Sequence, residues 1–223
     1  MCHECLHSEI KTIEILKFVV QMMLFCFGVG IKYNDCLHLV NQYDPSNGYL
    51  DTYRQCGRGG YGVETTNTGN RDNQSGTWQI VSKSGETGTV FHGDLVHLVN
   101  QYDPSNGYLD MYGCTCRGGY RVETTNKGKR DNLSGTWKIV SRSGKYGALL
   151  HGDLVHIVNQ LDPSKGYLDT YGDSGRGGYG VETTDTENRV EYRNTGNGTG
   201  TWMIGKDCFN RKNIQKSSNL IQI

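Results

Sequence analysis

Hydrophobic and polar residues alternate in short runs along most of the chain, a pattern typical of β-strands that bury one face. In one such run Trp137 and Ile139 stand on either side of Lys138, so both apolar side chains fall on the same face of the strand. Four runs of apolar or alternating residues follow one another at 95–101, 107–112, 120–125 and 135–142. The pattern predicts four strands in this part of the chain.

The same set of runs occurs three times. The motif NQYDPSNGYLD at 41–51 returns unchanged at 100–110 and as NQLDPSKGYLD at 159–169, which gives a period of 59 residues. Units of this length are individually near the size at which a hydrophobic core becomes marginal, so we expect the three units to share one core. The sequence predicts one domain, with repeats at about 31–90, 91–149 and 150–206 and a polar tail at 207–223.

The repeated motif is typical of a hairpin loop between the first two strands of each repeat. Its proline presets φ for a turn, and the Asn-Gly pair that follows tolerates positive φ. Glycine is frequent in the chain and proline is scarce, which suits strands joined by many tight turns. Four strands in each of three repeats predict an all-β fold of about twelve strands.

Such a set of strands must protect its edges, and two closed architectures compete. A β-propeller typically needs roughly four or more blades, so three repeats would close only with a partner chain. A β-trefoil instead places three four-stranded units in one barrel, capped by three hairpins around a pseudo-threefold axis. The threefold repeat favours the β-trefoil.

Short motifs also carry a family resemblance. The units combine G-D-x-V-H-L near the start, Y-L-D after the first turn, V-x-T in the third strand and G-T-W-x-I in the fourth. Over about residues 31–206 the chain resembles the MIR and fascin-like branch of β-trefoil domains. The Q-x-W signature of ricin-type lectins is absent, because each repeat reads T-W-[QKM]-I instead. The resemblance therefore implies a binding module without a ricin-like galactose site, and not a catalyst.

Polar side chains of the first hairpin recur in all three repeats and form the candidate site. Carboxylates and amides beside a tyrosine could hydrogen-bond sugar hydroxyls while the ring stacks on the sugar. Turn chemistry alone also explains Asp-Pro and Asn-Gly, so a purely structural loop is the alternative. The candidate ligand-binding residues are Asp44, Asn47, Tyr49, Asp51, Asp103, Asn106, Tyr108, Asp110, Asp162, Tyr167 and Asp169.

Repeat three departs from the other two at this hairpin. It carries Leu161 in place of tyrosine and Lys165 in place of asparagine, so we expect it to bind more weakly. Several equivalent sites on one body raise avidity for a ligand that is itself repeated. The sequence thus favours multivalent binding of glycans or glycoproteins. The alternative is a fascin-like or MIR-like protein-interaction module that cross-links a protein filament such as actin.

The recurring tryptophans are expected to be structural, and the recurring acids are not expected to be catalytic. Trp78, Trp137 and Trp202 alternate in step with isoleucines, which places their rings in the core rather than on a sugar-binding surface. The candidate acids come in three similar copies, whereas glycoside hydrolysis needs one defined pair of carboxylates in a cleft. We expect no enzymatic activity and no cofactor.

Three histidines at equivalent positions raise the question of a metal site. His38, His97 and His156 could meet on a threefold axis as a three-imidazole site. Each stands beside valine and leucine in a first strand, however, where an imidazole can hydrogen-bond to neighbouring backbone. The structural role is favoured, so we expect no metal. The cysteines do not recur with the repeat, so a disulfide framework serving the fold is not expected either.

Net charge and the chain ends bear on partners and location. Lysine plus arginine equals aspartate plus glutamate, so nucleic acid is not an expected partner, and the arginine of each RGGY stands alone among glycines. The uncharged apolar run at 18–31 could be a signal peptide, a membrane anchor or packed helix, or part of a misassigned start. Membrane contact is expected through residues 1–30 if at all.

The location is left open by the sequence. An extracellular location is slightly favoured, with a cytoplasmic one as the alternative. Glycosylation sequons at Asn73, Asn132 and Asn197 each stand five residues before the tryptophan of their repeat, and they would matter only in a secretory pathway.

Overall fold

The structure, a computed structural model, describes residues 30–55, 59–69, 71, 73–115, 118–126, 132–174, 177–186 and 198–206. These residues form twelve strands and two 3-10 helices of three residues, with no α-helix among them. The all-β expectation is therefore confirmed for the described part of the chain. The expected N-terminal helix and the polar tail at 207–223 lie outside the described residues.

Each repeat supplies four strands, as the alternating runs predict. The 3-10 helices are η1 (Pro45–Asn47) and η2 (Pro163–Lys165), and both lie in the repeated hairpin loop. The strands are β1 (Cys36–Asn41), β2 (Tyr49–Gln55), β3 (Tyr61–Thr66), β4 (Trp78–Ser82), β5 (Leu95–Asn100), β6 (Tyr108–Cys114), β7 (Tyr120–Thr125), β8 (Trp137–Ser141), β9 (Leu154–Asn159), β10 (Tyr167–Asp173), β11 (Tyr179–Thr184) and β12 (Trp202–Lys206).

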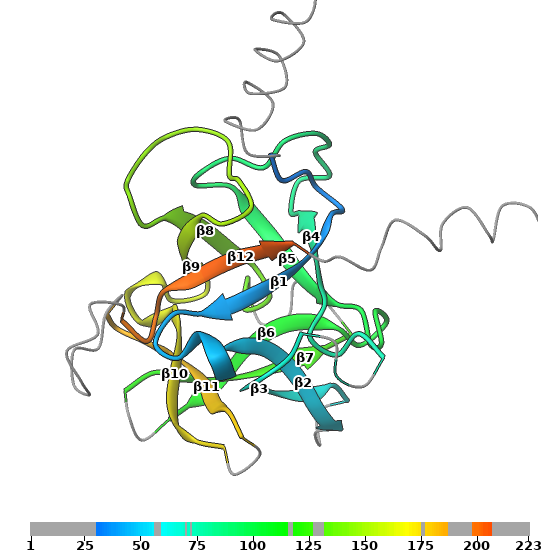
Figure 1. Cartoon of the computed structure of the whole chain (residues 1–223), viewed down its shortest axis with the longest axis vertical. Coiled ribbons are helices and arrows are strands. Elements are labelled where there is room, and N and C mark those ends of the chain that lie inside the picture. Colours follow the sequence, from blue (N-terminus) through cyan, green and yellow to red (C-terminus); the bar gives the residue numbers. More distant parts are fainter. Residues whose placement is uncertain are drawn as a thin grey trace, which may run out of the picture.

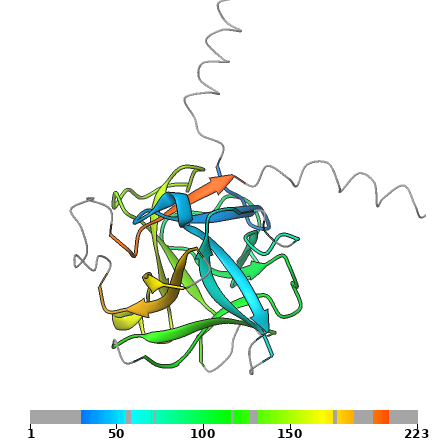
Figure 2. The ribbon, with the colours of Figure 1, turned by 60° about the horizontal axis from the view of Figure 1, so that its bottom comes forward.

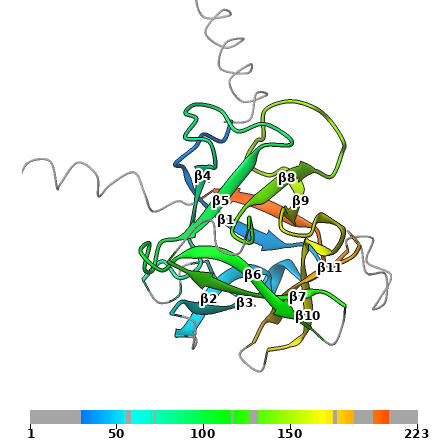
Figure 3. The same ribbon diagram turned by 180° about the vertical axis from the view of Figure 1, so that it is seen from behind.

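The first and fourth strands of the repeats form a closed ring of antiparallel pairs. Around this ring β1 pairs with β4, β4 with β5 and β5 with β8. The ring continues from β8 to β9, from β9 to β12 and from β12 back to β1. These six strands lie in the upper part of the molecule in Figures 1 and 3. Because the ring is closed, none of its strands is an open edge.

The second and third strands form three hairpins that cover one end of the ring. The hairpins are β2–β3, β6–β7 and β10–β11, and each has a register irregularity near the end of its first strand. Their inner strands also contact one another, because β3 pairs with β7, β7 with β11 and β11 with β3. Figure 2 shows the cyan, green and yellow hairpins around a common centre. The period of the sequence is thus a threefold arrangement in space.

The tryptophans of the fourth strands lie in the core, as their alternation with isoleucine predicts. Trp78, Trp137 and Trp202 are each 0% exposed. Each indole Nε1–H donates to a backbone carbonyl of the second strand in its own repeat, at 2.9 Å to Leu50 O, 2.8 Å to Leu109 O and 2.8 Å to Leu168 O. The tryptophan therefore fixes the hairpin of each repeat to the ring of six strands that the hairpin covers.

The glycine of the repeated loop is required for a reason that differs from the expected one. Gly48 has φ of −98°, so the Asn-Gly pair does not need positive φ here. A Cβ at Gly48 would lie 2.4 Å from Asn41 O, and one at Gly107 would lie 2.4 Å from Asn100 O. Glycine is needed because the loop crosses close over the end of the preceding strand.

Candidate functional site

The carboxylate of Asp44 organises the first hairpin loop. Asp44 precedes η1, and its Oδ1 accepts hydrogen bonds from the Ser46 amide at 3.2 Å and the Ser46 hydroxyl at 2.5 Å. Its Oδ2 accepts from Asn47 Nδ2 at 2.9 Å and from the Tyr179 hydroxyl at 3.0 Å. The predicted site residues Asp44 and Asn47 are therefore neighbours in one hydrogen-bond network.

The second repeat reproduces this arrangement almost atom for atom. Asp103 accepts hydrogen bonds from the Ser105 hydroxyl at 2.5 Å, from Asn106 Nδ2 at 2.8 Å and from the Tyr61 hydroxyl at 3.1 Å. In repeat three, Asp162 accepts from the Ser164 hydroxyl at 2.6 Å and from the Tyr120 hydroxyl at 2.9 Å. Lys165 stands where the other loops have asparagine, so the amide donor is missing there.

The tyrosine that donates to each aspartate belongs to the preceding repeat, with repeat three preceding repeat one. Tyr61 of repeat one reaches Asp103 of repeat two, and Tyr179 of repeat three returns to Asp44 of repeat one. We call these three places the repeat junctions. They are Tyr43, Asp44, Asn47 and Tyr179 at junction one, Tyr102, Asp103, Asn106 and Tyr61 at junction two, and Leu161, Asp162, Lys165 and Tyr120 at junction three.

Aromatic pairs complete two of the junctions. Tyr43 and Tyr179 meet edge to face with ring centroids 5.5 Å apart, and Tyr61 and Tyr102 do the same at 5.5 Å. Tyr102 is 46% exposed, so its ring is accessible at the surface. Leu161 takes the equivalent place at junction three and is 38% exposed. Junctions one and two are alike, and junction three lacks the second ring.

The hydrogen bonds shift the acidity of the groups that they join. Donation from the Asn47 and Ser46 side chains lowers the pKa of Asp44, because both stabilise the ionised carboxylate. Donation from the Asn106 and Ser105 side chains lowers the pKa of Asp103 in the same way. Burial, followed by the bond to Asp44, raises the pKa of Tyr179 to about 12. Each junction therefore holds a carboxylate that is ionised at neutral pH.

The tyrosines that begin the second strands lie against the recurring histidines. The imidazole of His38 contacts the Tyr49 ring edge to face at 5.7 Å between centroids, and its Nδ1 lies 2.9 Å from Gly76 O. A carbonyl oxygen is only an acceptor, so Nδ1 carries the proton and donates. The same contacts occur for His97 with Tyr108 and Gly135 O, and for His156 with Tyr167 and Gly200 O.

The last predicted acids of each hairpin lie inside the fold. Asp51, Asp110 and Asp169 are at most 2% exposed, and each stands opposite a buried glutamate of the third strand. Arg71 lies 3.3 Å from Asp51 and 3.4 Å from Glu64, joining the pair in repeat one. Burial raises the pKa of Asp51, while the Arg71 charge opposes this shift. The structure thus separates these three aspartates from the surface groups of the loop.

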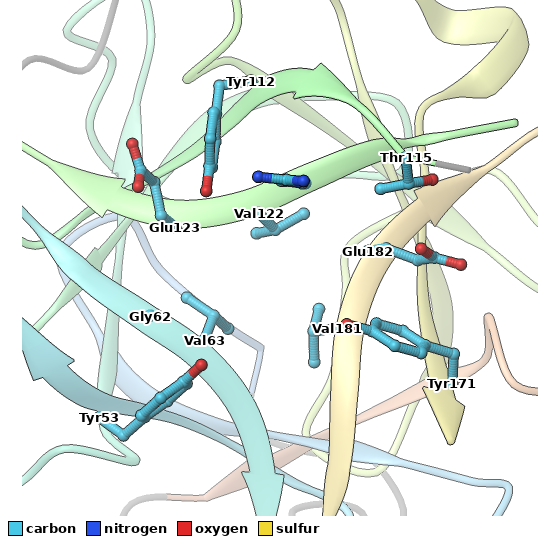
Figure 4. Close-up of a pocket in the computed structure, with 11 residues that line it drawn as sticks. Tyr53, Gly62, Val63, Tyr112, Thr115, Val122, Glu123, Tyr171, Val181 and Glu182 are labelled. Atoms are coloured by element: carbon cyan, nitrogen blue, oxygen red, sulfur yellow. The ribbon is translucent and has the colours of Figure 1, made fainter. Parts of the chain in front are cut away.

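A pocket that the sequence reasoning missed opens where β3, β7 and β11 meet. It has a volume of about 330 Å³. Figure 4 shows residues from all three repeats around it. The tyrosines that line it recur with the same period of 59 residues, which is the signal that could have identified them. Its symmetry-related lining residues are Tyr53, Tyr112, Tyr171, Val63, Val122 and Val181.

Among the described residues, no group of three histidine, cysteine, aspartate or glutamate side chains is placed to hold a metal ion. Within the same part of the chain, no helix has the length and apolar character needed to cross a membrane.

Comparison with known proteins relates the chain to others mainly through its fold. No family model matches the chain. Peptide chain release factor 1 of Mycolicibacterium vanbaalenii is 28% identical over 167 residues, and that of Mycolicibacterium gilvum is 27% identical over the same length. The match covers 63% of this chain and 45% of either relative, so the chain spans less than half the length of these relatives. This level of identity does not place the chain in that family.

Solved structures resemble it over most of its length. An SDF2-like protein of Arabidopsis thaliana has a TM-score of 0.60 at 16% identity, covering 79% of this chain and 95% of that one. A Caenorhabditis elegans protein of unknown function has a TM-score of 0.59 at 16% identity, with 79% and 96% covered. The cytolethal distending toxin of Actinobacillus actinomycetemcomitans gives 0.52 at 14% identity, with 78% and 92% covered. At such identities the likeness shows a shared all-β fold.

Proposed function

We propose that this chain is a β-trefoil of MIR-like type that acts as a non-catalytic carbohydrate-binding module. The closed ring of six strands and the three hairpins at one end support the β-trefoil assignment. The short motifs that resemble MIR domains point the same way, as does the likeness to an SDF2-like protein. The proposed binding surfaces are the repeat junctions.

The single observation that carries the proposal is the exposed aromatic ring beside an ordered polar loop. At junction two, Tyr102 is 46% exposed and is held edge to face against Tyr61. A fixed aromatic face is a suitable platform for the apolar side of a pyranose, because the ring loses little conformational entropy on binding. Asp103, Ser105 and Asn106 lie in the next turn of the same loop.

The aspartates of the junctions have a positioning role in this proposal. The carboxylate of Asp44 already accepts hydrogen bonds from four protein donors, which matches the acceptor capacity of a carboxylate. Direct contact with sugar hydroxyls falls instead to the hydroxyls of Ser46 and Tyr179, whose oxygens have further lone pairs. Asn47 adds an amide oxygen at the same place. Asp44 fixes all three side chains.

The remaining predicted residues support the loop from below. Tyr49 packs against His38, and Asp51 is buried against Arg71. We propose the same supporting role for Tyr108, Asp110, Tyr167 and Asp169, which occupy the equivalent places. Junctions one and two then bind alike, and junction three binds more weakly because Leu161 replaces the tyrosine ring.

A glycan array probed with the full chain tests this proposal. The double substitution Tyr43→Ala and Tyr102→Ala removes the half-buried ring of junction one and the exposed ring of junction two, and it leaves the aspartate networks in place. The matched control is Tyr146→Ala, because Tyr146 is 91% exposed on a different loop. We expect selective glycan binding by the wild type and by Tyr146→Ala, and loss of binding to at least part of these glycans by the double variant at unchanged thermal stability.

Two results would overturn the assignment. An unchanged profile of glycan binding after the double substitution would place all of the binding elsewhere. Absence of binding to any glycan, with co-sedimentation of the chain with actin filaments in the presence of free sugar, would favour the cross-linking role suggested by the fascin-like resemblance.

A further inference from the structure

The pocket between β3, β7 and β11 lies on the axis that relates the three repeats. Its tyrosines and its valines each come once from every repeat, at positions 59 residues apart. Val63, Val122 and Val181 are 5%, 6% and 5% exposed, whereas Tyr171 is 39% exposed. Tyr53 and Tyr112 are half-buried, so the valines form the base of this axial pocket and the more accessible tyrosines form its rim.

The rim presents hydroxyl groups toward the middle of the axial pocket. Figure 4 shows the phenol groups of Tyr53, Tyr112 and Tyr171 directed inward from three sides. A phenol oxygen has an O–H and two lone pairs, so it can bond a ligand in addition to a protein partner. The combination is an apolar base surrounded by groups that both donate and accept. Such a site suits a ligand with an apolar face and hydroxyls around its edge.

Two of the three tyrosine rings are held in place by tight packing on glycine. A Cβ at Gly62 would lie 2.6 Å from the Tyr53 ring, and one at Gly180 would lie 2.6 Å from the Tyr171 ring. These rings lie directly on the backbone of the third strand, which restricts their motion. A rim fixed before the ligand arrives costs less entropy on binding.

Arg121 breaks the threefold symmetry of the axial pocket. It is exposed and stands where the other repeats have Gly62 and Gly180. In the pairing of β7 with β11 its backbone lies opposite that of Glu182, so these two strands bring one charge of each sign to the pocket wall. The carboxylates of Glu123 and Glu182 are directed away from the middle in Figure 4. The pocket therefore favours an uncharged ligand, with one guanidinium to set its orientation.

We propose that the axial pocket binds one six-membered ring that carries equatorial hydroxyl groups, as in a β-glucopyranose or an inositol. In the chair form, the axial hydrogens on one face stand on alternate carbons and give an apolar face of threefold symmetry. The equatorial hydroxyls radiate around the edge of the same ring. The hydrogens pack on the three valines while alternate hydroxyls reach the three phenols. Arg121 donates to an oxygen on one side.

This inference rests on the proposed carbohydrate-binding function but concerns a second site with one ligand per chain. An epimer such as a galactoside has one axial hydroxyl. When its ring lies flat on the valines, that hydroxyl points out of the plane of the rim. The axial pocket is therefore expected to discriminate a β-glucoside from a β-galactoside. The repeat junctions impose no such symmetry.

Isothermal titration of the full chain tests the inference with three probes: methyl β-D-glucopyranoside, methyl β-D-galactopyranoside and scyllo-inositol. We expect the glucoside to bind with one molecule per chain and the galactoside to bind at least about fivefold more weakly. Binding of scyllo-inositol alone would identify the cyclitol as the source of the ring. Binding of the glucoside alone would identify the sugar. Either result supports the shared chemistry.

Substitutions separate the axial pocket from the junctions. Tyr112→Phe removes one hydroxyl without changing the ring and should weaken glucoside binding about fivefold, and Arg121→Gly should weaken it about tenfold. The triple substitution Tyr53→Phe, Tyr112→Phe and Tyr171→Phe should abolish it. The double variant at Tyr43 and Tyr102 should bind the glucoside as the wild type does.

The inference fails if none of the three probes binds, or if binding is indifferent to the triple substitution in a protein with unchanged thermal stability. Neither failure affects the junction proposal if the substitution of Tyr43 and Tyr102 still abolishes binding to at least part of the glycans on the array. Conversely, Tyr112→Phe weakens glucoside binding in a second outcome, while the array shows no binding that depends on Tyr43 and Tyr102. That result would refute the junction proposal and support the axial pocket.

Discussion

Tyr179 donates a hydrogen bond of 3.0 Å to Asp44, although the two residues are 135 positions apart in the chain. This bond joins the third repeat to the first. The bond from Tyr61 to Asp103 and the bond from Tyr120 to Asp162 join the other neighbours in the same sense. The three bonds form a cycle that ties every repeat to the next at the outer surface.

Alkaline titration should reveal that Tyr179 is buried and bonded to Asp44. The pKa of Tyr179 is raised to about 12 from an ordinary value of 10.0, so the stabilisation is complete below about pH 10 and is lost as the pH rises through about 12. We expect the tyrosinate absorbance difference between the wild type and Tyr179→Phe to show one phenol titrating near 12. Asp44→Asn should lower that midpoint. A Tyr179 phenol titrating at its ordinary value would contradict both its burial and its bond to Asp44.

Gly119→Ala should destabilise the fold strongly. A Cβ at this position would lie 1.5 Å from Thr183 O, because the start of β7 passes directly over β11 of the next repeat. Backbone atoms must move to relieve this contact, so we expect a loss of about 3 kcal/mol in the free energy of unfolding, measured by urea denaturation. Gly30→Ala is the matched control, since its Cβ would be 3.8 Å from the nearest atom. Equal stability of the two variants would refute the explanation.

Arg71→Met should lower the free energy of unfolding, because Arg71 pairs with the buried acids of repeat one. Asp51 and Glu64 are 0% and 2% exposed, and Arg71 contacts both, so its removal leaves two buried carboxylates without that cation. Near neutral pH we expect a loss of about 3 kcal/mol in the free energy of unfolding.

The loss caused by Arg71→Met should shrink on acidification. Burial raises the pKa of Asp51 above its ordinary value of 3.8, and this effect grows without the arginine charge. The folded state then takes up a proton before the unfolded state does, so its deficit diminishes as the pH falls. Asp51→Asn in the same variant should restore part of the stability at neutral pH. A deficit that does not change with pH would argue against buried charge as its cause.

Leu161→Tyr should increase carbohydrate binding under the junction proposal. The substitution places a second ring beside Tyr120 and reproduces the aromatic pair of junctions one and two. We expect a higher apparent affinity for a glycan presented at high density, with little change for a monovalent one, because the gain lies in the number of sites. Surface plasmon resonance at two ligand densities measures this. An apparent affinity at high density equal to that of the wild type would show that the third junction does not bind even with the added ring.

The sequence determined the strands and their number per repeat because these depend on local alternation. The predicted run at 120–125 coincides with β7, and the run at 135–142 contains β8. The burial of Trp78, Trp137 and Trp202 also follows from alternation, since side chains two residues apart share a face. The period of 59 residues likewise determined that the chain has three equivalent units.

The tertiary structure decided what each recurring residue does, because the decisive contacts join different repeats. Asp44 and Asp51 are seven positions apart in one motif, yet one lies in a surface loop and the other is buried against Arg71. No local pattern pairs Tyr179 with Asp44, or brings Tyr53, Tyr112 and Tyr171 around one axial pocket. Their meeting follows from closure of the three repeats around a common axis, which local propensity does not encode.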